Sequence, residues 1–236
     1  MRSISVWDLP TRIFHWLLVA CVASAYLTGS ARPHGLQYAI HVASGYAVAL
    51  LLVFRLLWGF GGGEHARFGG FVAGWKAVKS HLQGLLRLAP ARVLGHNAIG
   101  GWVIVVILAT LLLIVLTGLL AQGVPGGAGP LSGVLPEALV KPVGSIHELL
   151  GSFIIYLAAF HVAGVLVESV LLRENLAGAM VTGRKAAENA ADRDARPAPR
   201  WRAALVLLLV ALLATGMVGA TQLPGPGGPP QQIGKG

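Results

Sequence analysis

Two histidines lie at opposite ends of one apolar stretch, HELLGSFIIYLAAFH, which runs from His147 to His161. They are fourteen residues apart, and at about 100° per residue of an α-helix this spacing returns to within roughly 40° of the same face. A rise of about 1.5 Å per residue separates them by roughly 21 Å, against a hydrocarbon core of about 30 Å. Because ring nitrogens are costly inside hydrocarbon, the two imidazoles are candidate functional groups.

Two further apolar stretches carry polar residues of the same kind. His15 stands at the entrance of the first, in the string RIFHW, and His41 stands near the start of the second. Arg55 follows His41 by fourteen residues, so it shares the His41 face of a helix and lies roughly 21 Å further along its axis. An arginine at that depth requires an anionic partner.

Composition indicates an integral membrane protein. Of 236 residues, 55% are hydrophobic and 11% are charged, whereas soluble domains carry about 25% charged residues. The net charge of +9 does not indicate nucleic-acid binding, because the lysines and arginines cluster between apolar runs. The single cysteine, Cys21, lies in an apolar run, so we expect a small buried side chain with no internal disulfide.

Hydropathy predicts an all-α protein with four membrane spans, at about 13–30, 37–60, 97–122 and 146–172, and a fifth span at 203–222. We interpret the first as a retained helix and not a signal peptide, because ARPHG is a poor cleavage site. An amphipathic helix within 61–95 is expected on the membrane surface, and an irregular loop at 123–145 with a short helix near Pro136. A basic linker at 187–202 precedes the fifth span, and a flexible tail follows it at 223–236.

The positive charges predict the orientation of these spans. If the spans alternate, fourteen of the eighteen lysines and arginines fall on one side, and only Arg32, Lys141 and Lys235 fall on the other. Basic residues favour the cytoplasmic side of a membrane protein. We therefore expect a bacterial inner-membrane protein with its N-terminus in the cytoplasm and its C-terminal tail in the periplasm.

Orientation gives each histidine a depth. His15 and His161 fall near the inner face, whereas His41 and His147 fall near the outer face. Two imidazoles that face each other at one level of a helix bundle are what a haem with two axial ligands requires. The sequence therefore predicts two haems, one near each face, although helix contacts remain the alternative for any single histidine.

Small residues on the same helix faces support the haem hypothesis. Gly45 follows His41 by four residues, Gly151 follows His147 by four, and Gly164 follows His161 by three. Each would leave room for a flat macrocycle, although glycine is also common at helix contacts in membranes.

Two more residues are candidates for cofactor binding. Arg55 would contact a haem propionate or a quinone headgroup, or else extend to lipid phosphate. His96, at the start of the third span, would contact a propionate or quinone, or else be solvated. The remaining histidines fall in expected loops or in the surface helix and are interpreted as surface residues: His34, His65 and His81.

Several motifs resemble a known family. VWDLPTRIFHW, FRLLWGFGGGEHARF, LGHNAIGGW and the stretch from HELLGSF to MVTGRK are similar to the bacterial cytochrome b561 family, in the branch of the cytochrome b subunits of nickel-iron hydrogenases. The resemblance covers about residues 4–186, and the fifth span and tail depart from the short members. It implies a four-helix bundle with two haems b, whose ligands map onto His15, His41, His147 and His161.

The function expected from this resemblance is electron transfer between a periplasmic partner, a c-type cytochrome or an enzyme subunit, and the membrane quinone pool. One alternative is oxidation of a small reductant such as superoxide at the outer haem, although few basic residues are expected on that face. A second is a membrane anchor subunit, whose histidines serve only as helix contacts. We expect no Ser-His-Asp set, nucleotide loop or zinc site to add other chemistry.

Overall fold

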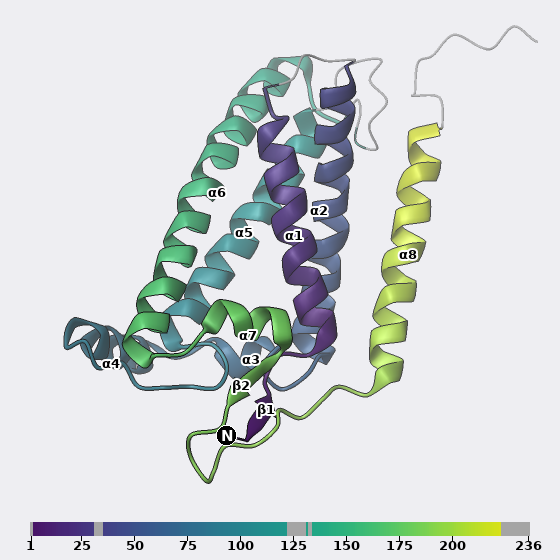
Figure 1. The fold of residues 1–236 in the computed structure, drawn as a ribbon. Helices are drawn as coiled ribbons and strands as arrows, with labels where there is room; N and C mark the ends of the chain where they lie inside the picture. The colour runs from purple at the N-terminus through teal and green to yellow at the C-terminus, as the bar shows by residue number, and fades with distance from the viewer. Residues whose placement is uncertain (1, 31–34, 122–130, 132–133, 223–236) are drawn as a thin grey trace, which may run out of the picture.

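The structure is a computed structural model that describes residues 2–30, 35–121, 131 and 134–222. Figure 1 shows long helices side by side, with short elements gathered at the end where the N-terminus lies. In chain order the elements are β1 (Ser3–Ser5), α1 (Leu9–Leu27), α2 (Leu36–Gly61), α3 (Phe68–Phe71), α4 (Trp75–Leu86), α5 (Ala98–Ala121), α6 (Glu137–Leu172), α7 (Leu176–Thr182), β2 (Arg184–Ala186) and α8 (Arg200–Gln222).

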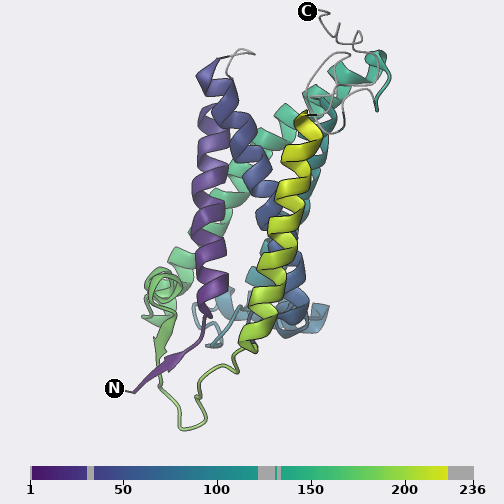
Figure 2. The same cartoon turned by 90° about the vertical axis from the view of Figure 1, so that its right-hand side faces the viewer.

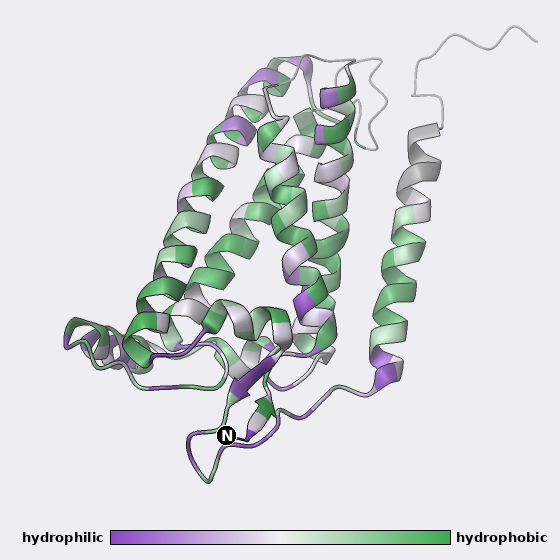
Figure 3. Ribbon diagram, in the orientation of Figure 1, coloured by the Kyte–Doolittle hydropathy of each residue, from purple (hydrophilic) through white to green (hydrophobic). Residues whose placement is uncertain are grey.

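Four of the described helices, α1, α2, α5 and α6, are long and apolar enough to cross a membrane. Helix α1 packs on α2 and α5 packs on α6, and the two pairs meet through α2 and α5 (Figure 1). Figure 3 shows hydrophobic residues along these helices, and many of their large apolar side chains are exposed. In a bilayer those side chains contact lipid, so the all-helical membrane bundle is confirmed.

The buried core is a thin seam along the bundle axis. It is apolar and is contributed chiefly by α2, with partners from α1, α5, α6 and α8: Phe14, Val48, Leu52, Phe54, Trp58, Ala66, Leu108, Leu111, Ile154 and Val206. Close packing of these side chains fixes the position of each helix along its neighbours. It therefore also fixes the relative depth of the histidines that the helices carry.

Asp8 joins three parts of the chain at the start of α1. Its carboxylate accepts hydrogen bonds from the Thr11 backbone N–H at 2.9 Å and the Gly63 backbone N–H at 3.2 Å. The Trp58 indole N–H also donates to it, at 3.2 Å. The first contact caps α1, and the other two fix the entrance of that helix against the end of α2.

Replacing Asp8 by alanine should destabilise the bundle. The lost cap contributes about 1 kcal/mol, and two further hydrogen bonds at about 1 kcal/mol each bring the expected loss to about 2–3 kcal/mol. Thermal unfolding of the full chain in detergent measures it. Asp8→Asn keeps an acceptor oxygen and is the matched control; an equal loss in both variants would contradict this role.

Helix α6 begins earlier than the sequence predicted. The expected irregular loop ran to Ser145, but α6 starts at Glu137 and contains Pro142. Glu137 lies in its first turn, where a carboxylate complements the helix dipole. Pro142 comes just after that turn, so it removes few backbone hydrogen bonds, and the expected short helix is the first turn of α6. Residues 122–130 and 132–133 of that loop lie outside the described part.

The short elements at the N-terminal end form a structured cap that the sequence analysis missed. Strand β1 pairs antiparallel with β2, with Ser3 opposite Ala186. Arg92 lies 3.0 Å from Asp192 and 2.5 Å from Glu174, and Lys185 lies 3.1 Å from the other oxygen of Glu174. This end therefore holds the residues before α5, the end of α6 and the linker together. The amphipathic surface helix, α4, is confirmed within the expected range.

Helix α8 runs alongside α2 (Figure 2). It contributes Val206 to the core, and Arg202 of its first turn donates to the Gly61 carbonyl at 3.4 Å. That α8 is a fifth span stays a prediction. The tail at 223–236 and His34 lie outside the described residues.

Candidate functional site

His41 of α2 and His147 of α6 face each other at the end of the bundle far from the β-strands. Their ring centroids are 6.0 Å apart and their planes are nearly perpendicular, at 87°. The Nδ1 of His41 lies 2.8 Å from the Ala25 carbonyl oxygen, and the Nδ1 of His147 lies 2.9 Å from that of Ile114. A carbonyl only accepts, so each Nδ1 carries the proton and each Nε2 lone pair is free to bind a metal.

His15 of α1 and His161 of α6 lie near the other end of the bundle. His161 interacts electrostatically with His15 and also with His96. The Nδ1 of His15 is buried without a hydrogen-bond partner. A buried polar atom without a partner usually awaits a ligand or water. The structure thus brings the rings of the outer pair into contact, and the pairing of His15 with His161 stays a prediction.

Arg55 is buried and interacts electrostatically with His96, with 3% of its surface exposed. Its guanidinium donates to the Ala66 carbonyl at 2.9 Å and lies over the rings of Phe68 and Phe71, at 5.0 and 5.5 Å from their centroids. The nearest acidic influence comes from Asp8. Because the side chain is directed inward, its alternative contact with lipid phosphate is wrong, and it remains a cation able to bind an anionic group.

His96 is enclosed by two aromatic rings. The indole of Trp7 lies 4.6 Å away and the ring of Phe71 lies 4.8 Å away, centroid to centroid. Burial, followed by the charge of Arg55, lowers the pKa of His96 to about 3. The imidazole is therefore neutral at physiological pH, and its Nδ1 is buried without a partner. The Nδ1 of His96 is therefore not solvated, and a contact with a propionate or quinone stays a prediction.

A family model decides what class of protein carries these pairs. Residues 6–183 match the model described as prokaryotic cytochrome b561. The chain belongs to the prokaryotic cytochrome b561 family. Membership implies a multi-pass bacterial membrane protein that transfers electrons through haem b.

Curated relatives place the cytochrome in the hydrogenase branch of the family. The chain is 23% identical over 216 residues to a probable Ni/Fe-hydrogenase B-type cytochrome subunit of Rhizobium leguminosarum bv. viciae, covering 78% of this chain and 89% of the relative. A protein with the same name from Azotobacter chroococcum mcd 1 is 27% identical, over 77% and 88% of the two chains. The probable Ni/Fe-hydrogenase 1 B-type cytochrome subunit of Escherichia coli (strain K12) is 30% identical over 40% and 49%. No solved structure matches the chain.

The outer pair fits a haem of this family. Two metal–nitrogen bonds of about 2 Å each, together with the distance from each nitrogen to its ring centre, approach the 6.0 Å between centroids. The described residues contain no group of three or more His, Cys, Asp or Glu side chains that could hold a metal. Two imidazoles alone suit a metal whose remaining ligands come from a macrocycle.

Glycines shape the surroundings of the ligands in two ways. A Cβ added at Gly45, Gly151 or Gly164 would meet no atom within 4 Å, so space is open there, as the haem hypothesis requires. Gly118 of α5 differs, because a Cβ there would lie 2.9 Å from Cε1 of His147. The sequence analysis missed Gly118, because only the position of α5 against α6 reveals the contact.

Replacing Gly118 by alanine should weaken haem binding at the outer pair. The methyl group would displace the His147 ring, at an overpacking cost of about 1–3 kcal/mol. Haem quantitation of the purified variant should give a clearly lower haem-to-protein ratio than wild type. Gly216→Ala in α8, where a Cβ meets nothing within 4 Å, is the control. Full haem content in Gly118→Ala would contradict the contact.

Two histidines expected at the surface are not there. His81 is 8% exposed and lies 2.7 Å from Oε1 of Glu168, which is equally buried. His65 is half-buried, edge-on to Trp7 at 6.1 Å, and burial lowers its pKa. Both errors have one cause: each histidine is buried by residues distant from it in sequence, Glu168 for His81 and Trp7 for His65. The only sequence signal for Glu168 was an acid inside the apolar run VLVESVLL.

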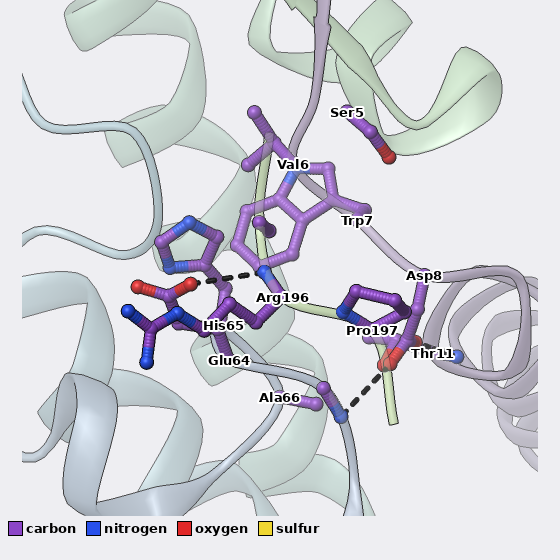
Figure 4. A pocket seen from close by; sticks show the side chains of 12 residues that line it. Ser5, Val6, Trp7, Asp8, Thr11, Glu64, His65, Ala66, Arg196 and Pro197 are labelled. Atoms are coloured by element: carbon purple, nitrogen blue, oxygen red, sulfur yellow. Dashed lines mark hydrogen bonds between the residues drawn. The ribbon is translucent and has the colours of Figure 1, made fainter. Parts of the chain in front are cut away.

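The described residues line two hollows. One, of about 40 Å³, lies between Trp7, Asp8, Glu64 and His65 (Figure 4). There a hydrogen-bonded pair with Arg193 lowers the pKa of Glu64 to about 2. The other, an open cavity of about 510 Å³, is lined only by apolar side chains of α4, α5 and α6: Trp75, Val78, Ile99, Trp102, Leu157 and Phe160 among them.

Proposed function

We propose that this cytochrome carries electrons across the membrane between a periplasmic redox partner and the quinone pool. Two haems b would be held by histidine pairs, the outer by His41 and His147 and the inner by His15 and His161. The observation that carries the proposal is the outer pair, whose rings lie 6.0 Å apart with both Nδ1 atoms engaged by carbonyls.

The protein's own contribution is to fix and tune its ligands. A carbonyl that accepts from Nδ1 holds the imidazole in one tautomer and orientation and raises the basicity of Nε2. At the outer pair these carbonyls belong to α1 and α5, so all four spans position one site. Haem iron, when bound, supplies the one-electron chemistry. The histidine spacing along α6 sets the distance between the two sites.

The distribution of charge supports the proposed orientation. Arg2, Arg92, Arg184 and Lys185 lie at the end of the bundle that carries the β-strands, where Figure 3 shows hydrophilic residues. Basic residues favour the cytoplasmic side. The N-terminus would then be cytoplasmic, and α8, as a fifth span, would deliver the C-terminal tail to the periplasm. The inner pair would face the cytoplasm.

The names of the relatives suggest the kind of redox partner. They are hydrogenase cytochrome subunits, which supports a redox enzyme subunit as the periplasmic donor. A c-type cytochrome remains an alternative donor for the same outer haem. Copurification of the full chain from its native membrane, followed by identification of the bound proteins, separates these two.

Electron transfer in vesicles tests the proposed function. The full chain is reconstituted with ubiquinone, and a reduced c-type cytochrome is supplied on the side of the outer pair. Haem reduction followed by formation of quinol is the expected result. In His147→Ala the c-type cytochrome should no longer reduce the protein, whereas quinol should still reduce the remaining haem. Purified protein without a reducible b-type spectrum, or haem reduction without quinol, would contradict the proposal.

A further inference from the structure

Helix α4 buries a histidine and exposes its apolar residues. His81 is the one buried residue that the structure describes in this helix, whereas Trp75, Leu82 and Leu86 are 79%, 47% and 77% exposed. On a membrane the apolar side chains of α4 would enter lipid, as in other interfacial helices. The imidazole is thereby directed away from lipid, into the bundle.

The partner of His81 is an acid buried in a membrane span. Glu168 and Ile154 are the buried residues of α6 within the described part. Oε1 of Glu168 lies 2.7 Å from Nε2 of His81, and Oε2 accepts from the Asn97 side-chain amide at 2.7 Å. Asn97 in turn accepts from the Gly100 backbone N–H at 2.6 Å. Three elements, α4, α6 and the start of α5, therefore converge on one buried carboxylate.

The pair shares helix α6 with His161 and shares α4 and α6 with the wall of the apolar cavity. Glu168 follows His161 by seven residues of α6, which is two turns and the same face, roughly 10.5 Å along the axis. The cavity, an open one of about 510 Å³, is bounded by Val78, one turn before His81, and by Ile99, two residues after Asn97. Phe160, next to His161, forms another wall. The pair thus belongs to two of the helices that form the cavity wall, α4 and α6, and Val78 of that wall lies one turn from His81.

We propose that His81 and Glu168 exchange protons with a quinone that occupies this cavity, an inference that rests on the proposed function. Reduction of one quinone to quinol takes up two electrons and two protons. Two successive one-electron transfers at the inner site supply the electrons. The pair passes protons to the two quinone oxygens, one at a time, and is reprotonated from water on the cytoplasmic side. Quinol oxidation runs the same steps in reverse.

A purely structural role accounts poorly for these residues. An ionisable pair is a costly way to join α4 to the bundle, since well-packed apolar side chains of similar volume often stabilise as well or better. Ionisable groups within membrane spans commonly mark proton paths. An imidazole and a carboxylate sharing a short contact are suited to moving a proton near neutral pH. The aromatic, apolar walls of the cavity suit a flat lipid-soluble ring.

Stopped-flow reduction of the full chain by decylubiquinol tests the pair. Loss of one general acid–base group typically slows a reaction by about 10²–10⁴-fold. We expect His81→Gln and Glu168→Gln to slow haem reduction by quinol at least 100-fold, while haem content and reduction by dithionite stay as in wild type. The controls, Lys79→Gln and Glu137→Gln, remove exposed charges from α4 and α6 and should react as wild type.

Infrared spectroscopy adds a readout independent of rate. The reduced-minus-oxidised difference spectrum with bound quinone should contain a carboxyl change that Glu168→Gln removes. Wild-type rates in both variants, or a difference spectrum without that change, would overturn the proposed role of the pair but not the proposed function. If haem reduction by dithionite slows as much as haem reduction by quinol, the proposed role is also overturned, because the pair then acts only in the stability of the fold. A wild-type protein that binds haem but takes no electrons from quinol would overturn the proposed function as well.

Discussion

Replacing His147 by alanine should leave the purified protein with one haem in place of two. His147 faces His41 at 6.0 Å, and its Nδ1 is held by the Ile114 carbonyl, which leaves its Nε2 as the axial ligand. Without that axial bond the outer haem has one protein ligand and should be lost. Haem quantitation against protein concentration measures the change, and the redox titration should lose one of two steps.

His65→Ala is the matched control for this variant. It removes an imidazole that is also half-buried but lies under the cap beside Trp7, and the protein should keep both haems. His161→Ala should lose the inner haem and keep the outer one. Two haems in His147→Ala, or none, would contradict the assignment of separate sites.

Replacing Arg55 by methionine should lower the reduction potential of the inner haem and leave the outer one unchanged. The guanidinium is a buried cation, and a nearby cation favours the reduced, less positive iron. Two unit charges roughly 8 Å apart interact by about 2 kcal/mol at an effective dielectric constant of about 20. For one electron this is a fall of about 90 mV.

A redox titration monitored by b-type absorbance measures both potentials. Lys76→Met removes an exposed cation from α4, where water screens the charge, and should shift neither potential appreciably. A fall of both potentials by equal amounts in Arg55→Met would show that Arg55 acts on the whole bundle and not on the inner site. Unchanged potentials would contradict its placement beside the inner haem.

Local pattern was enough to predict the scaffold and the pairing of the histidines. Four apolar runs of membrane length gave the spans, and the asymmetry of lysine and arginine gave their direction. Depth then assigned each histidine one partner, and the structure brings the rings of His41 and His147 together. The reasoning succeeded because helix rise and periodicity are nearly constant, so a sequence interval converts directly into a position.

The start of α6, the paired strands and the partners of His81 and Arg55 depend on contacts that no local sequence pattern encodes. Pro142 and Gly144 looked like breakers, although the helix accommodates both. Strands of three residues that pair across the length of the chain, as β1 and β2 do, leave almost no local signal. The amphipathicity of α4 predicted its helix but not which neighbour its histidine meets. The surroundings of Arg55 were likewise not predictable, because they depend on how the aromatic rings of α3 pack against its guanidinium.

Counting haem is the measurement that tests the central claim most directly. The claim is that one chain holds two haems b, each between two histidines of different helices. Purified full-length protein should contain two haems b per polypeptide, and its redox titration should resolve two one-electron steps. A ratio of one haem per chain, or a colourless protein, would contradict the account.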